Sequence, residues 1–245
     1  GKTTTLYSLI NFLNKPDINI VTIEDPIEYE MKYVNHTQVN PDQGITFATG
    51  LRAIVRQDPN IVMVGEIRDE ETAGIAVQAA LTGQLVLSTL HTNDAPSAVP
   101  RLFDLKVLPF LAAAVLNVIM AQRLVRRICL SCITSYKPDE AFASSIKEQF
   151  VALKLKEEVR VPKLLFKGQG CPTCNNTGYK GRVGIFELLA VSENIRRIIA
   201  TERFTLDALH DAARAEGMVS IFQDGLRKVE RGMTTVEEIL RVIRE

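Results

Sequence analysis

The sequence predicts an α/β fold built around a buried parallel sheet, and three observations predict it. Apolar runs of strand length recur in the first half of the chain, at residues 18–23, 61–64 and 85–90. Segments with helical spacing separate these runs, and strands that alternate with helices are typical of parallel sheets. Polar side chains follow each run, and the carboxyl edge of such a sheet is where ligands bind.

Composition sets limits on the class of protein. The chain has 245 residues, 46% of them apolar, which is enough for a sizeable core in one large domain or two smaller ones. Lys+Arg and Asp+Glu both number 29, so there is neither a basic footprint for nucleic acid nor a polybasic membrane-binding surface. No apolar run reaches the roughly 18 residues that a membrane span needs. The chain does not begin with Met, and we interpret it as a fragment that carries no targeting information at its start.

The first residues, Gly1, Lys2, Thr3 and Thr4, precede an apolar stripe with helical spacing at 6–13. They match the end of the GxxxxGK[ST] loop, in which backbone N–H groups cradle phosphates, the lysine reaches the β- and γ-phosphates, and the hydroxyl binds Mg²⁺. Only the last three positions of that pattern are present, so the motif depends on its context. These four residues are the candidate phosphate-binding group.

Carboxylates follow two of the predicted strands. Glu24 and Asp25 end the run at 18–23, where a following proline favours an extended Asp25. Glu66 follows the run at 61–64. One interpretation is a pair of solvated turns, and the other is a site that binds Mg²⁺ or orients water. His91, after the run at 85–90, is either a structural histidine or a sensor of the γ-phosphate.

Further elements surround these strands. Residues 33–39 alternate as an edge strand, while 46–56, 70–81 and 110–120 have helical patterns. Arg52 and Arg56 lie four apart on one helical face. They form either a solvated basic face or a pair that neutralises charge during phosphoryl transfer.

Four cysteines occur as two CxxC pairs, Cys129 with Cys132 and Cys171 with Cys174. Without a secretory context this spacing favours tetrahedral Zn²⁺ over disulfides, and free buried thiols are the alternative. The long segment between the pairs must form an excursion of its own, with a helix expected at 139–155.

The end of the chain reads as a returning strand at 182–189 and then helices at 195–200, 206–215, 221–230 and 236–243. Thr205 and Ser220 are predicted N-caps, and Gly217 and Gly232 are predicted helix stops. We therefore expect three parts: a nucleotide-binding core at 1–125, a cysteine-bearing part at 126–181, and a returning strand with a helical subdomain at 182–245.

Four segments, GKTTTLYSLI, VTIEDPIEYE, LRAIVRQDPNIVMVGEIRD and TGQLVLSTLHTNDA, occur in that order. The chain resembles the bacterial ATPases that power type II secretion and type IV pilus extension, and the segments match their Walker A, Asp box, Walker B and His box. The resemblance implies a RecA-like P-loop core, a tetracysteine zinc-knuckle insertion, and ATP hydrolysis coupled to mechanical work. Two positions depart from the family pattern: Asn60 stands where Asp is usual, and Gln84 where His is usual, which leaves His91 to carry the role of the His box.

The resemblance also implies roles for single residues. Lys2 and Thr3 would bind phosphate and Mg²⁺, with Glu66 as the Walker B carboxylate. Glu24 would be the better candidate for orienting water, although its role is not separated from that of Glu66. His91 would read the nucleotide state. The two arginines, Arg52 and Arg56, would face the site of a neighbouring subunit.

The family implies partners and a location. Its members typically form rings of six with ATP between subunits, at the cytoplasmic face of the bacterial inner membrane. There they contact inner-membrane platform proteins and cytoplasmic adaptor proteins. The tetracysteine insertion is typical of the secretion and extension branches rather than of retraction motors. Two alternatives are a RecA-like ATPase acting on nucleic acid, which the zero net charge disfavours, and a non-hydrolysing adaptor in the same machine.

Overall fold

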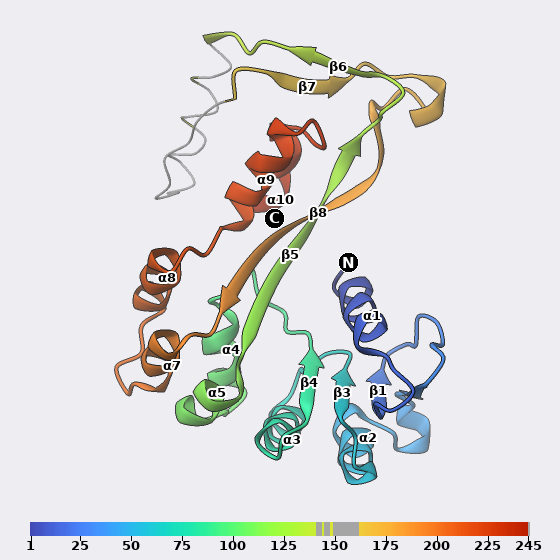
Figure 1. Cartoon of the computed structure of the whole chain (residues 1–245), viewed down its shortest axis with the longest axis vertical. Helices are drawn as coiled ribbons and strands as arrows, with labels where there is room; N and C mark the ends of the chain where they lie inside the picture. The colour runs from blue at the N-terminus through green and yellow to red at the C-terminus, as the bar shows by residue number, and fades with distance from the viewer. Residues whose placement is uncertain (141–143, 145–147, 149–161, 245) are drawn as a thin grey trace. The chain divides into compact units, whose positions relative to one another are not determined.

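The computed structural model describes residues 1–140, 144, 148 and 162–244 of the chain (Figure 1). The chain forms two compact units, and each is assembled from two separate stretches. We call Gly1–Ala121 with Glu187–Met218 the sheet unit, and Gln122–Phe186 with Val219–Glu245 the cysteine unit. The chain passes from one unit to the other after Ala121, Phe186 and Met218, so the part expected at 182–245 is divided between them.

The sheet unit contains a four-stranded parallel sheet in the order β2-β1-β3-β4. Its strands are β1 (Ile20–Glu24), β2 (Val34–Gln38), β3 (Ile61–Val64) and β4 (Leu85–Ser88). The predicted strands are confirmed, and β2 lies at an edge as its alternating pattern indicated. Every residue of β1 and β3 is buried, as expected for the central strands of a parallel sheet.

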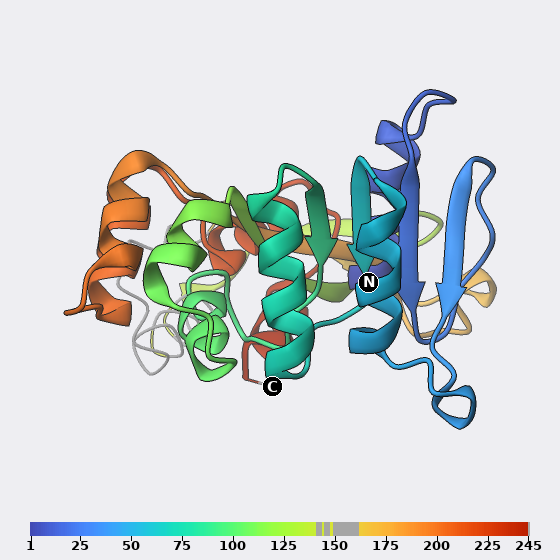
Figure 2. The same ribbon diagram turned by 90° about the horizontal axis from the view of Figure 1, so that it is seen from below.

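Helices cover both faces of this sheet. On one face, α1 (Lys2–Leu13) packs Leu6 and Ile10 against β1 and β3. The other face carries α2 (Phe47–Ile54) and α3 (Glu70–Leu81), which lie side by side in Figure 2. Gly50 of α2 has Ile23 directly beneath it, since a Cβ added there would lie 2.1 Å from the Ile23 Cδ1 atom. Short 3-10 turns, η1 (Pro41–Gln43) and η2 (Val55–Gln57), precede and follow α2.

The sheet unit also contains α4 (Ala98–Asp104), α5 (Pro109–Val115), α7 (Glu193–Ala200) and α8 (Leu206–Ala215). The helix expected at 110–120 is wrong in its second half, because Val118 already begins strand β5 (Val118–Ile128). Val118 and Ile119 are β-branched, and such residues favour strands over helices. The expected cap Thr205 is confirmed, since its hydroxyl accepts a hydrogen bond from the Ala208 N–H.

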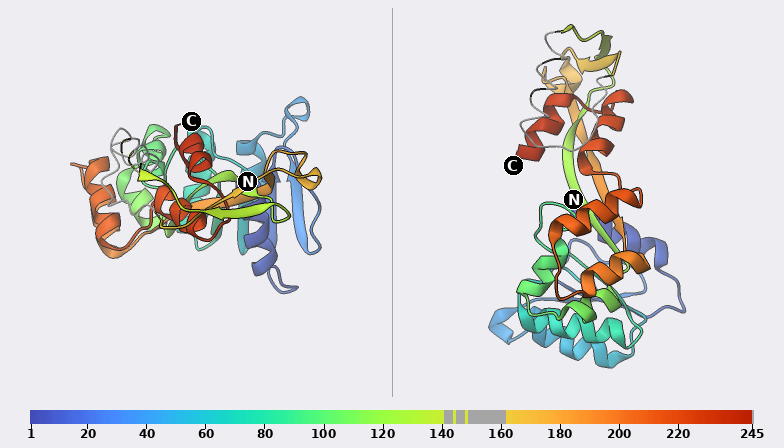
Figure 3. Two further views of the ribbon diagram at one scale, coloured as in Figure 1. Left: turned by 90° about the horizontal axis from the view of Figure 1, so that it is seen from above. Right: turned by 90° about the vertical axis from the view of Figure 1, so that its left-hand side faces the viewer.

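The cysteine unit is built on a long strand pair that continues from the sheet unit. β5 and β8 (Tyr179–Ala190) pair and run in opposite directions in Figure 1. Beyond them, β6 (Ile133–Tyr136) pairs antiparallel with β7 (Leu165–Gly168). Two neighbouring helices, α9 (Ile221–Glu230) and α10 (Val236–Arg244), complete the unit (Figure 3).

An apolar cluster joins α9 and α10 to β7 in the cysteine unit. Its buried members are Leu165, Phe222, Val229, Val236, Ile239 and Leu240. The predicted cap Ser220 begins α9, and Gly232 follows that helix in the left-handed region that glycine favours. Most of the helix expected at 139–155 lies outside the described residues. Among the helices that the structure describes, none is both long and apolar enough to cross a membrane.

Candidate functional site

The predicted polar residues meet at the carboxyl edge of the parallel sheet. Glu24 ends β1, Glu66 follows β3 after a single glycine, and His91 follows β4. Because β1, β3 and β4 are adjacent and parallel, all three side chains leave the same edge. Two hydrogen bonds fasten the tips of β3 and β4: the Thr89 hydroxyl donates to the Gly65 carbonyl at 2.8 Å, and the Ile67 N–H donates to the Thr89 carbonyl at 3.0 Å.

Glu66 lies between two cationic or protonatable side chains. Arg68 Nη2 is 2.5 Å from Glu66 Oε1, and His91 Nε2 is 3.0 Å from Glu66 Oε2. Partial burial alone would raise the pKa of Glu66, but the hydrogen bonds and charges of Arg68 and His91 hold that pKa below its ordinary value. Glu66 is therefore an ionised acceptor, suited to a Mg²⁺ ion or an ordered water.

The candidate phosphate-binding residues begin α1. Gly1 is the N-cap of that helix, and Lys2 and Thr3 lie in its first turn, where free backbone N–H groups favour anions. Lys2 Nζ donates to the carbonyl oxygen of Leu90 at 3.5 Å. Leu90 directly precedes His91 in the sequence. A positive charge, a helix N-terminus and an ionised carboxylate thus gather around the tips of β3 and β4.

Glu24 is enclosed to a greater degree than Glu66. Its side chain is 2% exposed, against 13% for Glu66. Tyr7 Oη donates to Glu24 Oε2 at 2.5 Å, while Glu24 Oε1 lies 2.6 Å from Thr22 Oγ1 and 2.8 Å from His36 Nδ1. Burial, together with the hydrogen bond to Glu24 and the charge of that residue, raises the pKa of Tyr7 to about 12, so the phenol stays a donor.

Three further predicted site residues, Asp25, Arg52 and Arg56, are exposed. Asp25 is exposed after β1. Arg52 on α2 pairs with Glu71 on α3, and both side chains are about half exposed. Arg56 is exposed in η2, and the next two residues accept hydrogen bonds from Asn19, at the amino end of β1. Arg52 thus pairs with a carboxylate in the first turn of α3, the helix that follows Glu66, whereas Arg56 lies near the residues before β1.

The four cysteines converge in the cysteine unit, with their sulfur atoms all within 4.8 Å of one another. The distances Cys129–Cys171, Cys132–Cys174 and Cys171–Cys174 are 3.9, 3.9 and 3.7 Å between Sγ atoms. Four thiolates about 2.3 Å from one tetrahedral ion would stand about 3.8 Å apart. The cluster can therefore hold a metal ion, and disulfides, at about 2.05 Å, do not fit these distances.

Backbone geometry shapes this cluster. The Cys171 N–H donates to Cys174 Sγ at 3.3 Å, within the 3-10 turn η3 (Pro172–Cys174). Burial alone would raise the pKa of Cys174, but backbone hydrogen bonds from Cys171 and Gly178 lower it to about 6. Gly168 and Gly178 pass backbone to backbone, since a Cβ on Gly168 would lie 2.1 Å from the Gly178 carbonyl oxygen.

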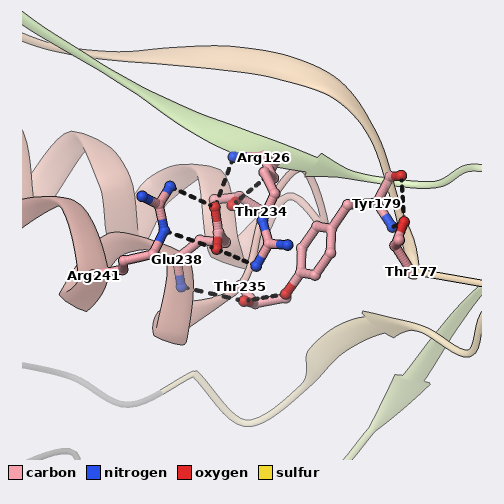
Figure 4. A network of polar contacts seen from close by, with 7 residues as sticks. All are labelled: Arg126, Thr177, Tyr179, Thr234, Thr235, Glu238 and Arg241. Carbon is pink, nitrogen blue, oxygen red and sulfur yellow. Dashed lines mark hydrogen bonds and ion pairs between the residues drawn. The ribbon is translucent and has the colours of Figure 1, made fainter. Parts of the chain in front are cut away.

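A polar network next to the cluster ties β5 to the C-terminal helix (Figure 4). Glu238 on α10 is 2% exposed and accepts hydrogen bonds from Arg126 and Arg241. The Arg126 guanidinium lies 4.3 Å from the centre of the Tyr179 ring, and the Tyr179 hydroxyl contacts Thr235 at 2.9 Å. Arg126 lies three residues before Cys129, so this network holds the strand that leads into the first CxxC pair.

Sequence reasoning did not identify several residues of these sites. Tyr7, Thr22 and His36 contact Glu24, but they come from three different elements, and Tyr7 is read simply as part of an apolar helix. Arg68 lies two residues after Glu66 and contacts it, but nothing in the sequence singles this arginine out. The signals that exist are the histidine in an edge strand and the tyrosine on a phosphate-binding helix, and neither is specific.

Solved structures of a pilus retraction motor and of another ATPase share this fold. The ADP-bound pilus retraction motor PilT matches with a TM-score of 0.69 and 29% sequence identity, covering 99% of this chain and 57% of that one. The Legionella pneumophila ATPase DotB matches with a TM-score of 0.68 and 22% identity, covering 100% of this chain and 57% of that one. At that identity the second likeness concerns the fold alone.

The sequence pattern of the family described as "Type II/IV secretion system protein" matches residues 1–241, and the chain belongs to this family. It is 48% identical over 240 residues to the type IV pilus assembly ATPase PilB of Thermus thermophilus, covering 98% of this chain and 26% of that protein. It is 49% identical over 245 residues to type II secretion system protein E of Pseudomonas aeruginosa, covering 100% of this chain and 47% of that protein. The chain thus spans less than half the length of these curated relatives.

Proposed function

We propose that this chain is the core of an ATP-hydrolysing motor with a RecA-like P-loop fold, which powers pseudopilus or pilus assembly in type II secretion or type IV pilus extension. The observation that carries the proposal is the Glu66–His91 pair at the carboxyl edge, with Lys2 and the N-terminus of α1 beside it. Phosphoryl transfer to water requires little beyond positioning and charge, and this edge supplies both signs of charge.

Each residue of the edge has a distinct task in this proposal. Lys2 and Thr3 bind the phosphates and Mg²⁺, with Gly1 and Thr4 completing the turn that cradles them. Glu66, kept ionised by its neighbours, faces Mg²⁺ or the attacking water. His91 reads the presence of the γ-phosphate, because its ring already contacts Glu66 and is 66% exposed.

The two predicted arginines would act between subunits and not within one chain. Arg52 and Arg56 are exposed on α2 and η2. In a homo-hexameric ring they would serve the site of the neighbouring subunit, where a cation stabilises transferring charge. Asp25, exposed at the tip of β1, is a further candidate for nucleotide or Mg²⁺ contact.

Zinc is the metal that suits the cysteine cluster best. Four sulfur ligands with near-tetrahedral separations match structural Zn²⁺ sites, and carboxylate or imidazole ligands are not among these four residues. The ion would hold the two CxxC pairs of the tetracysteine part, proposed at 126–181, between the core at 1–125 and the end at 182–245. Its task there is structural.

Partners follow from the family. The motor would act at the cytoplasmic face of the bacterial inner membrane, against the inner-membrane platform proteins and cytoplasmic adaptor proteins of a secretion or pilus machine. The balanced charge of the chain, with 29 basic and 29 acidic residues, supports a protein partner and not nucleic acid.

The experiment that tests the proposal is ATP turnover by the full-length protein, beside the same protein carrying Lys2→Ala. We expect the wild-type protein to turn over ATP and the variant to do so at least about a hundredfold more slowly, because the lysine contacts the transferring phosphates. If turnover is equal in both proteins, the P-loop assignment is wrong. If neither protein turns over ATP even with the membrane platform proteins added, the chain acts as an adaptor.

A further inference from the structure

Glu24 occupies a different environment from the other two tips of the parallel sheet. Its side chain is 2% exposed, whereas the exposed fractions at Glu66 and His91 are 13% and 66%. A side chain that contacts a nucleotide which binds and leaves must be accessible from the site. Glu24 presents almost none, although it lies on the strand next to Glu66.

Three elements supply hydrogen bonds to this carboxylate. Tyr7 donates from α1, Thr22 from β1 itself, and His36 from β2. The Met31 N–H donates to His36 Nε2 at 3.1 Å, so the neutral ring carries its proton on Nδ1 and donates it to Glu24. An ionised carboxylate has about four acceptor sites, and these three donors take most of them.

The same groups hold the loop that follows β1. Tyr7 Oη accepts a hydrogen bond from the Glu28 N–H at 3.2 Å, and the Tyr7 ring lies 4.6 Å from the ring of Tyr29, centre to centre. His36 accepts from Met31 further along this loop. Tyr7 also lies on α1, one and a half turns after Lys2, so its bond to Glu24 fixes the phosphate-binding helix against the sheet.

We infer that Tyr7 and His36 are positioning residues, and that Glu24 is a buried anchor which sets the first turn of α1 and does not touch the nucleotide. The inference rests on the function proposed above and divides the roles of its two carboxylates. Glu66 is then the one that meets Mg²⁺ or water. Its partners Arg68 and His91 are 63% and 66% exposed, so they can exchange a contact with Glu66 for one with a ligand.

The rival assignment makes Glu24 the group that orients the attacking water, with Tyr7 and His36 holding it in place. The two assignments differ in the kinetic constant that a lost contact changes. An anchor for α1 acts on nucleotide binding, because it places Lys2 and Thr3 in both ground and transition states. A water-orienting carboxylate acts on turnover at saturating ATP, because it works only in the reaction itself.

The first test uses Tyr7→Phe in the full-length protein, with Tyr29→Phe as its matched control. Both variants lose one phenolic hydroxyl from the same pair of neighbouring, tilted rings, but only Tyr7→Phe removes a donor from Glu24. We expect Tyr7→Phe to raise the KM for ATP and the Kd of a fluorescent ADP analogue about tenfold, with kcat within about threefold of wild type. Tyr29→Phe should leave all three constants within about twofold. A fall in kcat with unchanged KM, or no change at all in Tyr7→Phe, would overturn the inference.

The second test compares Glu24→Gln with Glu66→Gln, each checked by circular dichroism. Glutamine at position 24 can still accept from Thr22 and His36 and can donate to the Tyr7 oxygen, so an anchor tolerates it. We expect Glu24→Gln to keep at least about a tenth of the wild-type kcat, and Glu66→Gln to lose at least about a hundredfold. A hundredfold loss of kcat in Glu24→Gln with ATP binding intact would establish Glu24 as the reacting group and overturn the inference.

The two tests also separate this inference from the function on which it rests. If wild-type protein shows no turnover, the proposed motor function fails. Binding of the ADP analogue still measures the effect of Tyr7→Phe in that case. Weaker binding would support the anchor, and unchanged binding would refute it.

Discussion

Replacing Glu238 by glutamine should destabilise the cysteine unit, because this carboxylate is enclosed and has two cationic partners (Figure 4). Arg126 contacts it twice: Nη2 donates to Oε1 at 2.7 Å and the backbone N–H donates to Oε2 at 2.9 Å. Arg241 donates to Oε2 at 3.1 Å from the same helix as Glu238. Glutamine keeps the shape of the side chain but removes its charge and one acceptor.

The expected magnitude follows from the pKa of Glu238. Burial alone would raise that pKa, but the hydrogen bonds from Arg126 and Arg241 lower it from 4.5 to about 2. One pKa unit corresponds to about 1.4 kcal/mol, which gives an upper limit of about 3 kcal/mol for the stabilisation. The two guanidinium side chains are 52% and 45% exposed, so solvent screening reduces the expected loss to about 2 kcal/mol.

The sign of the pH dependence is fixed by the same shift. The pKa of Glu238 is lower in the folded than in the unfolded chain, so its stabilisation is complete above about pH 5 and is lost as the pH falls toward about 2. The difference between wild type and Glu238→Gln should therefore be largest near neutral pH. It should shrink by about half at about pH 3.

Native-state hydrogen exchange read by mass spectrometry is the suitable assay, because it reports each unit separately. Peptides from α10 and β5 should lose protection in Glu238→Gln, while peptides from α3 in the sheet unit should not change. Glu237→Gln is the matched control, since Glu237 is the exposed neighbour on the same helix. A loss of less than about 0.5 kcal/mol in the opening free energy of the cysteine unit near neutral pH would refute the reasoning. So would a loss in Glu237→Gln equal to that in Glu238→Gln.

Four further outcomes are expected. Glu66→Gln should bind ATP normally yet lose at least about a hundredfold in turnover, measured as phosphate release. Cys174→Ser should lower the zinc content of the purified protein well below that of wild type, and equal zinc in both by elemental analysis would contradict the zinc assignment. Gly168→Ala should destabilise the cysteine unit by at least about 2 kcal/mol in urea denaturation, because its methyl group would meet the Gly178 backbone. Gly74→Ala, at an open position inside α3, should instead stabilise the sheet unit by about 0.5–1 kcal/mol in the same assay.

The sheet could be predicted from local pattern because its strands are short, apolar and separated by amphipathic helices. The expected helix at 70–81 has the observed bounds, since Asp69 caps its start by accepting from the Thr72 N–H. The gathering of Glu24, Glu66 and His91 followed from topology alone, as parallel strands end at one edge. The spacing of the two CxxC pairs predicted the cluster of four cysteines.

Strand β5 was missed for a physical reason. Its residues alternate weakly, and three arginines fall within Val118–Ile128. The charge of Arg126 is tolerated on this strand because the arginine forms an ion pair with Glu238, which lies 112 residues further along the chain. Because that partner lies far away in the sequence, neither the hydrophobic periodicity nor the β-propensity of the neighbouring residues could identify the strand.

The contacts of Glu24 show the same limit at the candidate site. A carboxylate at the tip of a strand reads as catalytic whether or not it is accessible, because sequence gives its position but not its enclosure. The donors that enclose it, Tyr7 and His36, lie 17 residues before and 12 residues after it on two other elements. Only when the helix, the central strand and the edge strand are assembled does a reactive-looking residue become an anchor. That difference decides which of the two glutamates a mutational study should treat as the reacting group.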